Sequence, residues 1–216
     1  MSVLRWLGTA SGVGVVVALV AACGPPQAPP LPVTPTIVWS AGEPTSDLES
    51  DPWVAAVRAA AVPYAVAVNA VDTRSEELHS TVSERSILRL DNRLEGDGGD
   101  PDGTQRVPGP WPFDPLSVEV AEDGRSAVVH GCSIDKWVLT LSQHELPPSD
   151  PVKARAMVIK LDDGTYRLDT TIGSDVPCES DHLTIGVFDP LPVGDWEYDE
   201  RDVLTREDEW AWPIDG

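Results

Sequence analysis

The stretch LSVEVAEDGRSAVVHGCSID, residues 116–135, predicts a β-hairpin. Apolar and polar residues alternate from Leu116 to Val120, the period of two that places successive side chains on opposite faces of a strand. Asp123-Gly124 is a hairpin turn signal, because glycine accepts the positive φ that such turns require. We expect the partner strand to cover residues 125–135.

A second hairpin is predicted further along the chain. Residues 152–161 and 166–172 are two strand-like runs separated by another turn signal, Asp163-Gly164. The two hairpins together predict an antiparallel sheet of about four strands.

Helical patterns precede these strands. Ser50-Asp51-Pro52 is typical of a helix start, with Pro at the first helical position, and an Ala/Val-rich helix is predicted to run to about Asp72. Pro63 should kink it. Its length would also allow a membrane span, but Arg58 and Asn69 would be costly in hydrocarbon. The apolar stripe of this helix comprises Trp53, Val57, Ala60, Tyr64 and Val71.

Two capping boxes, Thr73-x-x-Glu76 and Thr81-x-x-Glu84, predict a short helix and then a longer one over residues 82–95. Gly96 is the expected stop of the longer helix. Its buried stripe is expected to contain Ile87, Leu90 and Leu94. Because helices come first and strands follow, the expected fold class is α+β, with N-terminal helices packed on an antiparallel sheet.

The N-terminus has the pattern of a secretory signal over residues 1–22. Arg5 supplies the positive charge, residues 13–20 are apolar, and small residues precede the expected cleavage site. The four residues Val20-Ala21-Ala22-Cys23 resemble the bacterial lipobox. That resemblance implies cleavage before Cys23 and acylation of its thiol, so the protein would be anchored to the extracytoplasmic face of the cell membrane. The alternative is an ordinary secretory signal followed by an unrelated cysteine.

The sequence contains 3 cysteines, an odd number for an exported protein. If Cys23 carries lipid, Cys132 and Cys178 remain as a natural disulfide pair outside the cytoplasm. Two buried free thiols are the alternative.

Charge and proline content constrain the rest of the chain. The formal net charge of −21 excludes the cationic surface needed for nucleic acid or for docking on anionic lipid. Residues 23–51 contain seven prolines after Cys23 and predict a lipid-anchored, Pro-rich linker. The folded domain is therefore expected over 52–190, followed by an acidic irregular tail over 191–216.

Residues 50–175 are similar to actinobacterial lipoproteins with a nuclear transport factor 2-like (SnoaL-like) domain. The resemblance rests on the order of elements, on the strand Ala127-Val128-Val129-His130-Gly131-Cys132 and on Asp135-Lys136-Trp137 after it. It implies a curved sheet that wraps helices into a cone with an internal cavity.

The same resemblance implies that general acid–base chemistry in such a cavity would use His or Asp beside Tyr or Trp. The pocket candidates are Tyr64, His130, Asp135 and Trp137. His130 and Asp135 are five positions apart, an odd offset that places them on opposite faces of a strand. We therefore expect no ready His–Asp pair, with Tyr64 and Trp137 in the core and His130 exposed or packed beside Cys132.

Other motifs are weak. Ser133-Ile134-Asp135-Lys136 matches the S-x-x-K nucleophile motif, but it lies in a strand pattern instead of opening a helix. The sequence contains no zinc-ligand set and no nucleotide-binding glycine loop, so no metal or cofactor is expected.

The favoured function is therefore a non-catalytic envelope module that binds a small apolar ligand or a protein partner. A small cavity enzyme and an acidic accessory protein for a cationic partner are the alternatives. An open cavity between helices and sheet would favour small-ligand binding over the accessory role.

Overall fold

The computed structural model describes residues 32–95, 105–134, 137–140, 150–180 and 183–192. The chain divides into two units, Met1–Pro30 and Leu31–Gly216, and every described residue belongs to the second. Some predictions lie outside the described residues: the signal peptide, lipidation of Cys23, the helix stop at Gly96 and the tail beyond residue 192.

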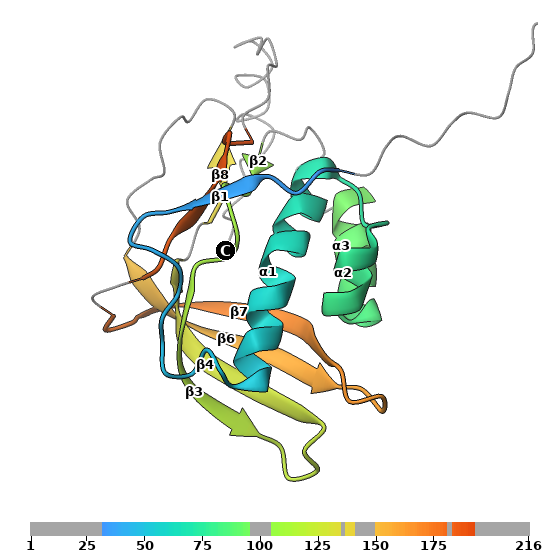
Figure 1. Ribbon diagram of the computed structural model, residues 1–216, viewed down its shortest axis with the longest axis vertical. Helices are drawn as coiled ribbons and strands as arrows, with labels where there is room; N and C mark the ends of the chain where they lie inside the picture. Colours follow the sequence, from blue (N-terminus) through green and yellow to red (C-terminus); the bar gives the residue numbers. More distant parts are fainter. Residues whose placement is uncertain (1–31, 96–104, 135–136, 141–149, 181–182, 193–216) are drawn as a thin grey trace, which may run out of the picture. The chain divides into compact units, whose positions relative to one another are not determined.

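The second unit is an α+β fold, as the order of patterns predicted (Figure 1). Its helices are α1 (Pro52–Ala70), α2 (Glu76–Thr81) and α3 (Glu84–Glu95). Its strands are β1 (Thr36–Trp39), β2 (Gln105–Arg106), β3 (Phe113–Val120), β4 (Ser126–Ile134), β5 (Leu139–Thr140), β6 (Pro151–Lys160), β7 (Tyr166–Pro177) and β8 (Gly186–Asp189).

The main sheet is four-stranded and antiparallel, in the order β3-β4-β6-β7. Both predicted hairpins are confirmed, and their turn glycines have positive φ, 65° at Gly124 and 87° at Gly164. The last strand runs to Pro177, five residues beyond the predicted end. Its continued pairing with β6 extends the strand where polar residues no longer alternate with apolar ones.

Helix α1 begins as expected. The Asp51 carboxylate accepts a hydrogen bond of 2.8 Å from the Trp53 amide, and Pro52 occupies the first helical position. The helix runs through Pro63 and ends at Ala70, two residues before the predicted end. Val71, the last residue of the predicted apolar stripe, lies just after the helix, where it adopts the left-handed conformation that closes the helix and is exposed.

The polar residues of α1 tie the helix to the rest of the fold. Arg58 forms a two-point ion pair with Glu49, with N–O distances of 2.7 and 2.9 Å, and donates to the Phe113 carbonyl at 2.7 Å. Asn69 makes two 2.8 Å hydrogen bonds with the backbone of Val107, one as donor and one as acceptor. By length and composition α1 could also cross a membrane, but here its apolar stripe packs on the sheet.

The two predicted capping boxes are displaced by two residues. Ser75 caps α2 through a 3.2 Å bond from the Leu78 amide, in place of Thr73. Ser83 caps the start of α3 through a 3.2 Å bond from the Ser86 amide, in place of Thr81. Both serines stand immediately before the first helical glutamate, where a hydroxyl reaches the free amides of the first turn.

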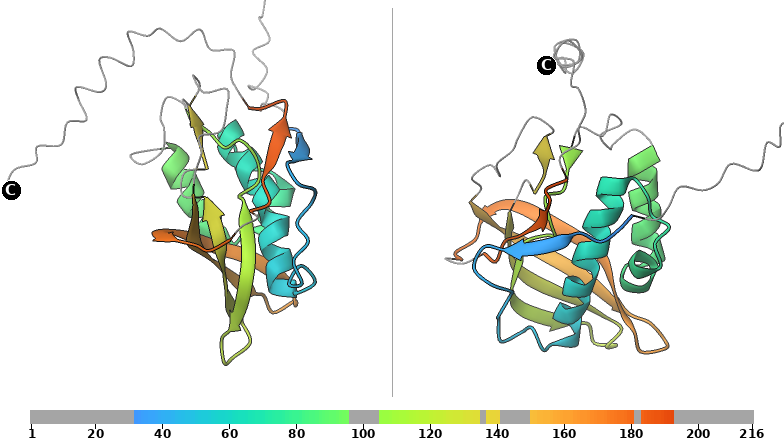
Figure 2. Two further views of the ribbon diagram at one scale, coloured as in Figure 1. Left: turned by 90° about the vertical axis from the view of Figure 1, so that its left-hand side faces the viewer. Right: turned by 45° about the horizontal axis from the view of Figure 1, so that its top comes forward.

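The helices α1 and α3 pack on one face of the curved sheet (Figures 1 and 2). Small inward residues on the sheet, Ala127, Ala154 and Ala156, let α1 approach closely. The predicted stripe of α3 is confirmed, with Ile87 and Leu90 buried and Leu94 half-buried against the core.

The Pro-rich linker is shorter than predicted. Strand β1 lies inside residues 23–51 and pairs antiparallel with β8, with Ile37 opposite Phe188. Ile37 and Phe188 pack with Ala65 and Val66 of α1 in a second small core. A four-residue strand whose partner is about 150 positions away carries too short a local pattern for sequence analysis to detect.

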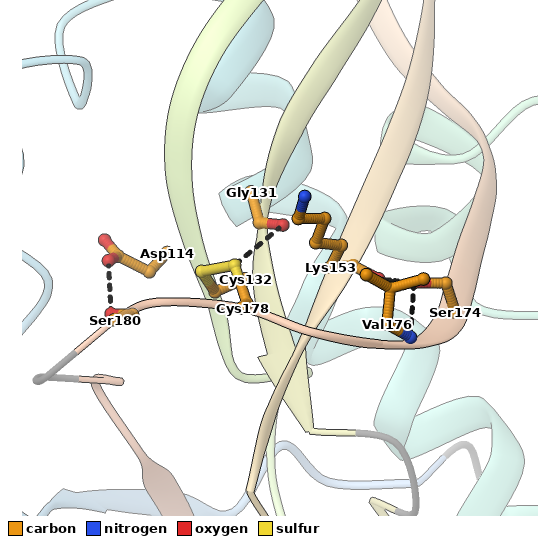
Figure 3. Close-up of a disulfide and its surroundings, with 8 residues drawn as sticks. All are labelled: Asp114, Gly131, Cys132, Lys153, Ser174, Val176, Cys178 and Ser180. Atoms are coloured by element: carbon orange, nitrogen blue, oxygen red, sulfur yellow. Dashed lines mark hydrogen bonds between the residues drawn. A yellow bond between two sulfur atoms is a disulfide. The ribbon is translucent and has the colours of Figure 1, made fainter.

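Cys132 and Cys178 form a disulfide with Cα atoms 5.7 Å apart (Figure 3). Cys132 lies near the end of β4, and Cys178 follows β7. The Cys178 amide also donates to the Pro151 carbonyl at 2.9 Å. The bridge therefore holds together the two strands that flank β6 at the end of the sheet where β6 begins.

Candidate binding cavity

A cavity of about 550 Å³ lies between α1, α3 and the inner face of β7. A volume of this size falls in the range of small-molecule binding sites, about 300–1,000 Å³. The other lining elements are the segment from β2 to Trp111 and the two residues before β5.

The second half of α1 forms one wall. Val57, Ala61, Tyr64 and Val68 follow each other at helical spacing and line the cavity. Tyr64 is half-buried, so its ring faces the apolar space while its hydroxyl reaches the rim.

Helix α3 forms the opposite wall. Leu90, which is buried, and Leu94, half-buried, line the interior, and the exposed Arg89 and Arg93 line the mouth. Arg93 donates a 2.9 Å hydrogen bond to the Tyr64 hydroxyl and lies 6.0 Å from the centre of its ring. The guanidinium therefore spans the gap between the two walls.

The third wall is the segment from β2 to Trp111 together with Trp137, and hydrogen bonds to backbone atoms hold it in place. Val107 is bound to Asn69 of α1, as described above, and the buried Trp137 donates from its indole nitrogen to the Gly109 carbonyl at 2.9 Å. Gly109 packs so closely on the backbone of Gly186 that a Cβ at this position would lie 2.2 Å from the Gly186 oxygen. Segment 105–111 can therefore pack this closely on β8 only because position 109 is a glycine.

Asp169, a buried carboxylate on β7, joins this strand to α3. It accepts hydrogen bonds from Ser83 at 2.7 Å and from Arg85. Burial alone would raise the pKa of Asp169, but the bonds from Arg85 and Ser83 and the charges of Arg85 and Arg89 hold that pKa below its usual value. The carboxylate is thus ionised and paired, on a strand whose neighbours Leu168 and Thr170 line the cavity.

The structure brings together two of the four predicted pocket residues. Tyr64 and Trp137 line the cavity. His130 does not: its neighbour Val129 is buried on the inner face, so His130 points to the outer face, 3.3 Å from the Glu119 carboxylate. Of the two expectations for His130, exposed or packed beside Cys132, the first is confirmed. The inclusion of His130 among the pocket residues was wrong. Asp135 lies outside the described residues.

The described lining of the cavity is largely apolar with a few polar side chains. Its described part contains apolar side chains, the hydroxyls of Tyr64, Ser86, Thr170 and Thr171, and arginines, but no His, Cys, Asp or Glu. The described residues also contain no group of three or more such side chains placed to hold a metal ion. Ser133 of the S-x-x-K match is buried in β4, 1% exposed, as expected for a strand residue.

Sequence reasoning missed the arginines. Arg89 and Arg93 lie one helical turn apart beside the predicted stripe of α3, and a third lining arginine, Arg106, lies in β2. The spacing Arg89-Leu90 and Arg93-Leu94 was a usable signal, because residues four apart share one helix face.

No protein-family model, no curated protein and no solved structure matches the chain.

Proposed function

We propose that this protein is a lipid-anchored lipoprotein on the extracytoplasmic face of the cell membrane that binds a small apolar ligand without catalysing a reaction. The observation that carries the ligand-binding part is the open, largely apolar cavity between α1, α3 and β7. An apolar ligand that leaves water for such a site gains about 25 cal/mol per Å² of buried surface.

The anchoring part rests on the N-terminal sequence. A signal-like segment ends in Val20-Ala21-Ala22-Cys23, and the disulfide between Cys132 and Cys178 suits an oxidising compartment outside the cytoplasm. Lipid on Cys23 would hold the domain near a source of apolar ligands.

The cavity also supports this proposal over its two alternatives, the acidic accessory protein and the cavity enzyme. An acidic accessory protein needs no internal space, whereas here an open cavity is present. A cavity enzyme needs a base at the site, and the described lining supplies hydrogen-bond donors and apolar surface.

We further propose that the domain is of the nuclear transport factor 2-like type. Helices on the concave face of an antiparallel sheet, with a cavity between them, support this assignment.

The ligand-binding part is tested by photocrosslinking. The full chain is placed in phosphatidylcholine nanodiscs and irradiated with a neutral diazirine-bearing dodecanol, and labelled peptides are mapped by mass spectrometry. We expect saturable labelling on α1 and α3, competed by unlabelled dodecanol. The variant Ala61→Trp, which places an indole in the cavity, should abolish it.

Ala59→Trp is the matched control, because Ala59 lies on the same helix but is exposed to solvent. If labelling persists in Ala61→Trp, or never concentrates on the cavity walls, the ligand-binding proposal is wrong. Intact-mass analysis of the protein extracted from native membranes tests the anchor: an unmodified Cys23 would refute it.

A further inference from the structure

The cavity of an acidic protein has a cationic rim. The chain has 36 Asp and Glu against 15 Lys and Arg, yet the described lining contains three arginines and no carboxylate. Residues drawn at random from this sequence would include more than two acidic side chains for each basic one. The described lining is therefore positively charged, whereas the whole chain is negatively charged.

The arginines stand where the apolar interior meets solvent. On α3, Leu90 is 1% exposed and lines the interior, while Arg89 and Arg93 are exposed at the mouth. Residues four apart in a helix lie on one face, so these two guanidinium groups can reach the same ligand group.

Two of the three arginines have donors to offer. Arg93 uses one N–H on the Tyr64 hydroxyl, and that hydroxyl, acting as acceptor, keeps its own proton to donate. Arg89 makes no hydrogen bond or ion pair with any residue in the described part of the chain. The buried carboxylate nearby, Asp169, is already bound by Arg85 and Ser83.

We infer that the cavity selects an anionic amphiphile: an aliphatic chain in the apolar interior, ending in a carboxylate or phosphate held by Arg89 and Arg93 with the Tyr64 hydroxyl. Guanidinium groups bind both oxyanions through paired N–H bonds, which an alcohol or an ammonium cannot accept in the same way. This inference rests on the proposed function, since it assigns the head group of the ligand that the same cavity would bind.

The test compares head groups on one chain length. The full chain in phosphatidylcholine nanodiscs is irradiated with diazirine-bearing dodecanoate, dodecyl phosphate, dodecanol or dodecyltrimethylammonium, and labelling of α1 and α3 is titrated. We expect half-saturation for the two anions at a concentration about tenfold lower than for dodecanol, because a hydrogen bond to a charged group is worth about one decade or more. The cation should label least.

Arginine variants make the test specific. Arg89→Gln with Arg93→Gln should bring half-saturation for the two anions to the level of dodecanol, with a larger change for the anions than for dodecanol. Arg89→Glu with Arg93→Glu should reverse the order, so that dodecyltrimethylammonium labels better than dodecanoate. Arg125→Gln is the control, because Arg125 is an exposed arginine that pairs with Asp162 and does not line the cavity.

The outcomes separate the two claims. Equal labelling by dodecanoate and dodecanol, unchanged in the Gln variants, would overturn anion selection and leave apolar-ligand binding intact. Absence of labelling on the cavity walls by every probe would overturn both. Stronger labelling by dodecyl phosphate than by dodecanoate, or the reverse, would identify which oxyanion the rim prefers.

Discussion

The two halves of α1 face the same sheet in different ways. In residues 52–60, here called the closed half, Trp53, Val54 and Ala60 are buried in a continuous core. In residues 61–70, the open half, Tyr64 and Val68 are half-buried and line the cavity. One helix therefore packs mainly as core before Ala61, where Val57 alone lines the cavity, and supplies most of the cavity wall after it, where Ala65, Val66 and Ala67 are also buried.

The difference comes from what each half meets. The closed half lies over strands whose inward residues include Ala127, Ala154 and Ala156, which allow close packing. The open half faces α3 and β7 across the cavity, and the long side chains of Arg89 and Arg93 on α3 are exposed at its mouth instead of filling the space. Small residues on the sheet thus allow tight packing under the first half of α1. Arginines on α3 leave an unfilled cavity beside its second half.

Removing the disulfide should have the largest effect, because it supports the sheet beneath both halves. The bridge closes a loop of 46 residues, for which the chain-entropy relation gives about 4 kcal/mol. We expect Cys132→Ser with Cys178→Ser to lower the free energy of unfolding by about that amount in urea titration. Wild-type protein treated with reductant should match the double variant; a loss below about 1 kcal/mol in both would contradict this prediction.

A pair of valine truncations tests the comparison directly. Val54 of the closed half is fully buried in the core, whereas Val68 of the open half lines the cavity. We expect Val54→Ala to cost about 2–3 kcal/mol of unfolding free energy and Val68→Ala less than about 1 kcal/mol, because a cavity wall loses fewer contacts. Chemical denaturation measures both. Equal losses would show that the open half is as tightly packed as the closed one.

The link between α3 and β7 predicts a dependence on pH. Asp169 has a folded-state pKa below its ordinary value of 3.8, so its contribution to stability is complete above that value and declines as pH falls through the lowered pKa. Asp169→Asn should therefore cost about 2 kcal/mol at pH 7, the size of a bond to a charged group. The deficit should shrink below about pH 4.

Parallel denaturation of wild type and variant from pH 7 to pH 2.5 measures this difference. Ser83→Ala removes the neutral donor to Asp169 together with the cap on the Ser86 amide, and is the comparison variant: the part of its loss that comes from the cap should persist on acidification. A deficit in Asp169→Asn that grows on acidification would contradict the assigned direction of the pKa.

The smallest effect is expected at the rim. Tyr64→Phe removes a hydroxyl whose described partner is the exposed Arg93, so the free energy of unfolding should change by no more than about 0.5 kcal/mol. A loss above about 1.5 kcal/mol would mean that this pair supports the fold, and the rim would then not be free to exchange its hydrogen bonds for a ligand.

Sequence patterns predicted the parts of the fold that depend on local periodicity. The two Asp-Gly hairpins, the start of α1 at Pro52 and the stripe of Ile87 and Leu90 follow from residues a few positions apart. Strand β1 could not be predicted, because only its distant partner β8 makes it a strand. The capping boxes misplaced the helix starts by two residues, since Thr and Ser supply the same hydroxyl and tertiary contacts choose between them.

The site was less predictable than the fold. Tyr64 and Trp137 were pocket candidates because the family resemblance implies Tyr or Trp beside the acid–base group, and both line the cavity. The strand period already indicated that His130 could not share a face with Asp135, and the outward position of His130 agrees with that geometry. The spacing of Arg89 and Arg93 was a local signal that they share one helix face, but their position at a cavity, together with Arg106 of β2, depends on the tertiary placement of α3 and β2 beside α1, which no local pattern encodes.

The two hydrogen bonds between Asn69 and Val107 bear on how a ligand would enter and leave the cavity. They hold segment 105–111, on one side of the entrance, to α1, and the Phe188 amide donates a further 2.8 Å hydrogen bond to the Pro108 carbonyl of the same segment. On the α3 side, Ser83 and Arg85 bind Asp169 of β7 at the first turn, Thr73 donates to Asp91, and Leu90 is buried in the core. Backbone movement on either side of the entrance would therefore break hydrogen bonds or core contacts, whereas the exposed side chain of Arg89 can move aside without breaking a hydrogen bond to any described residue.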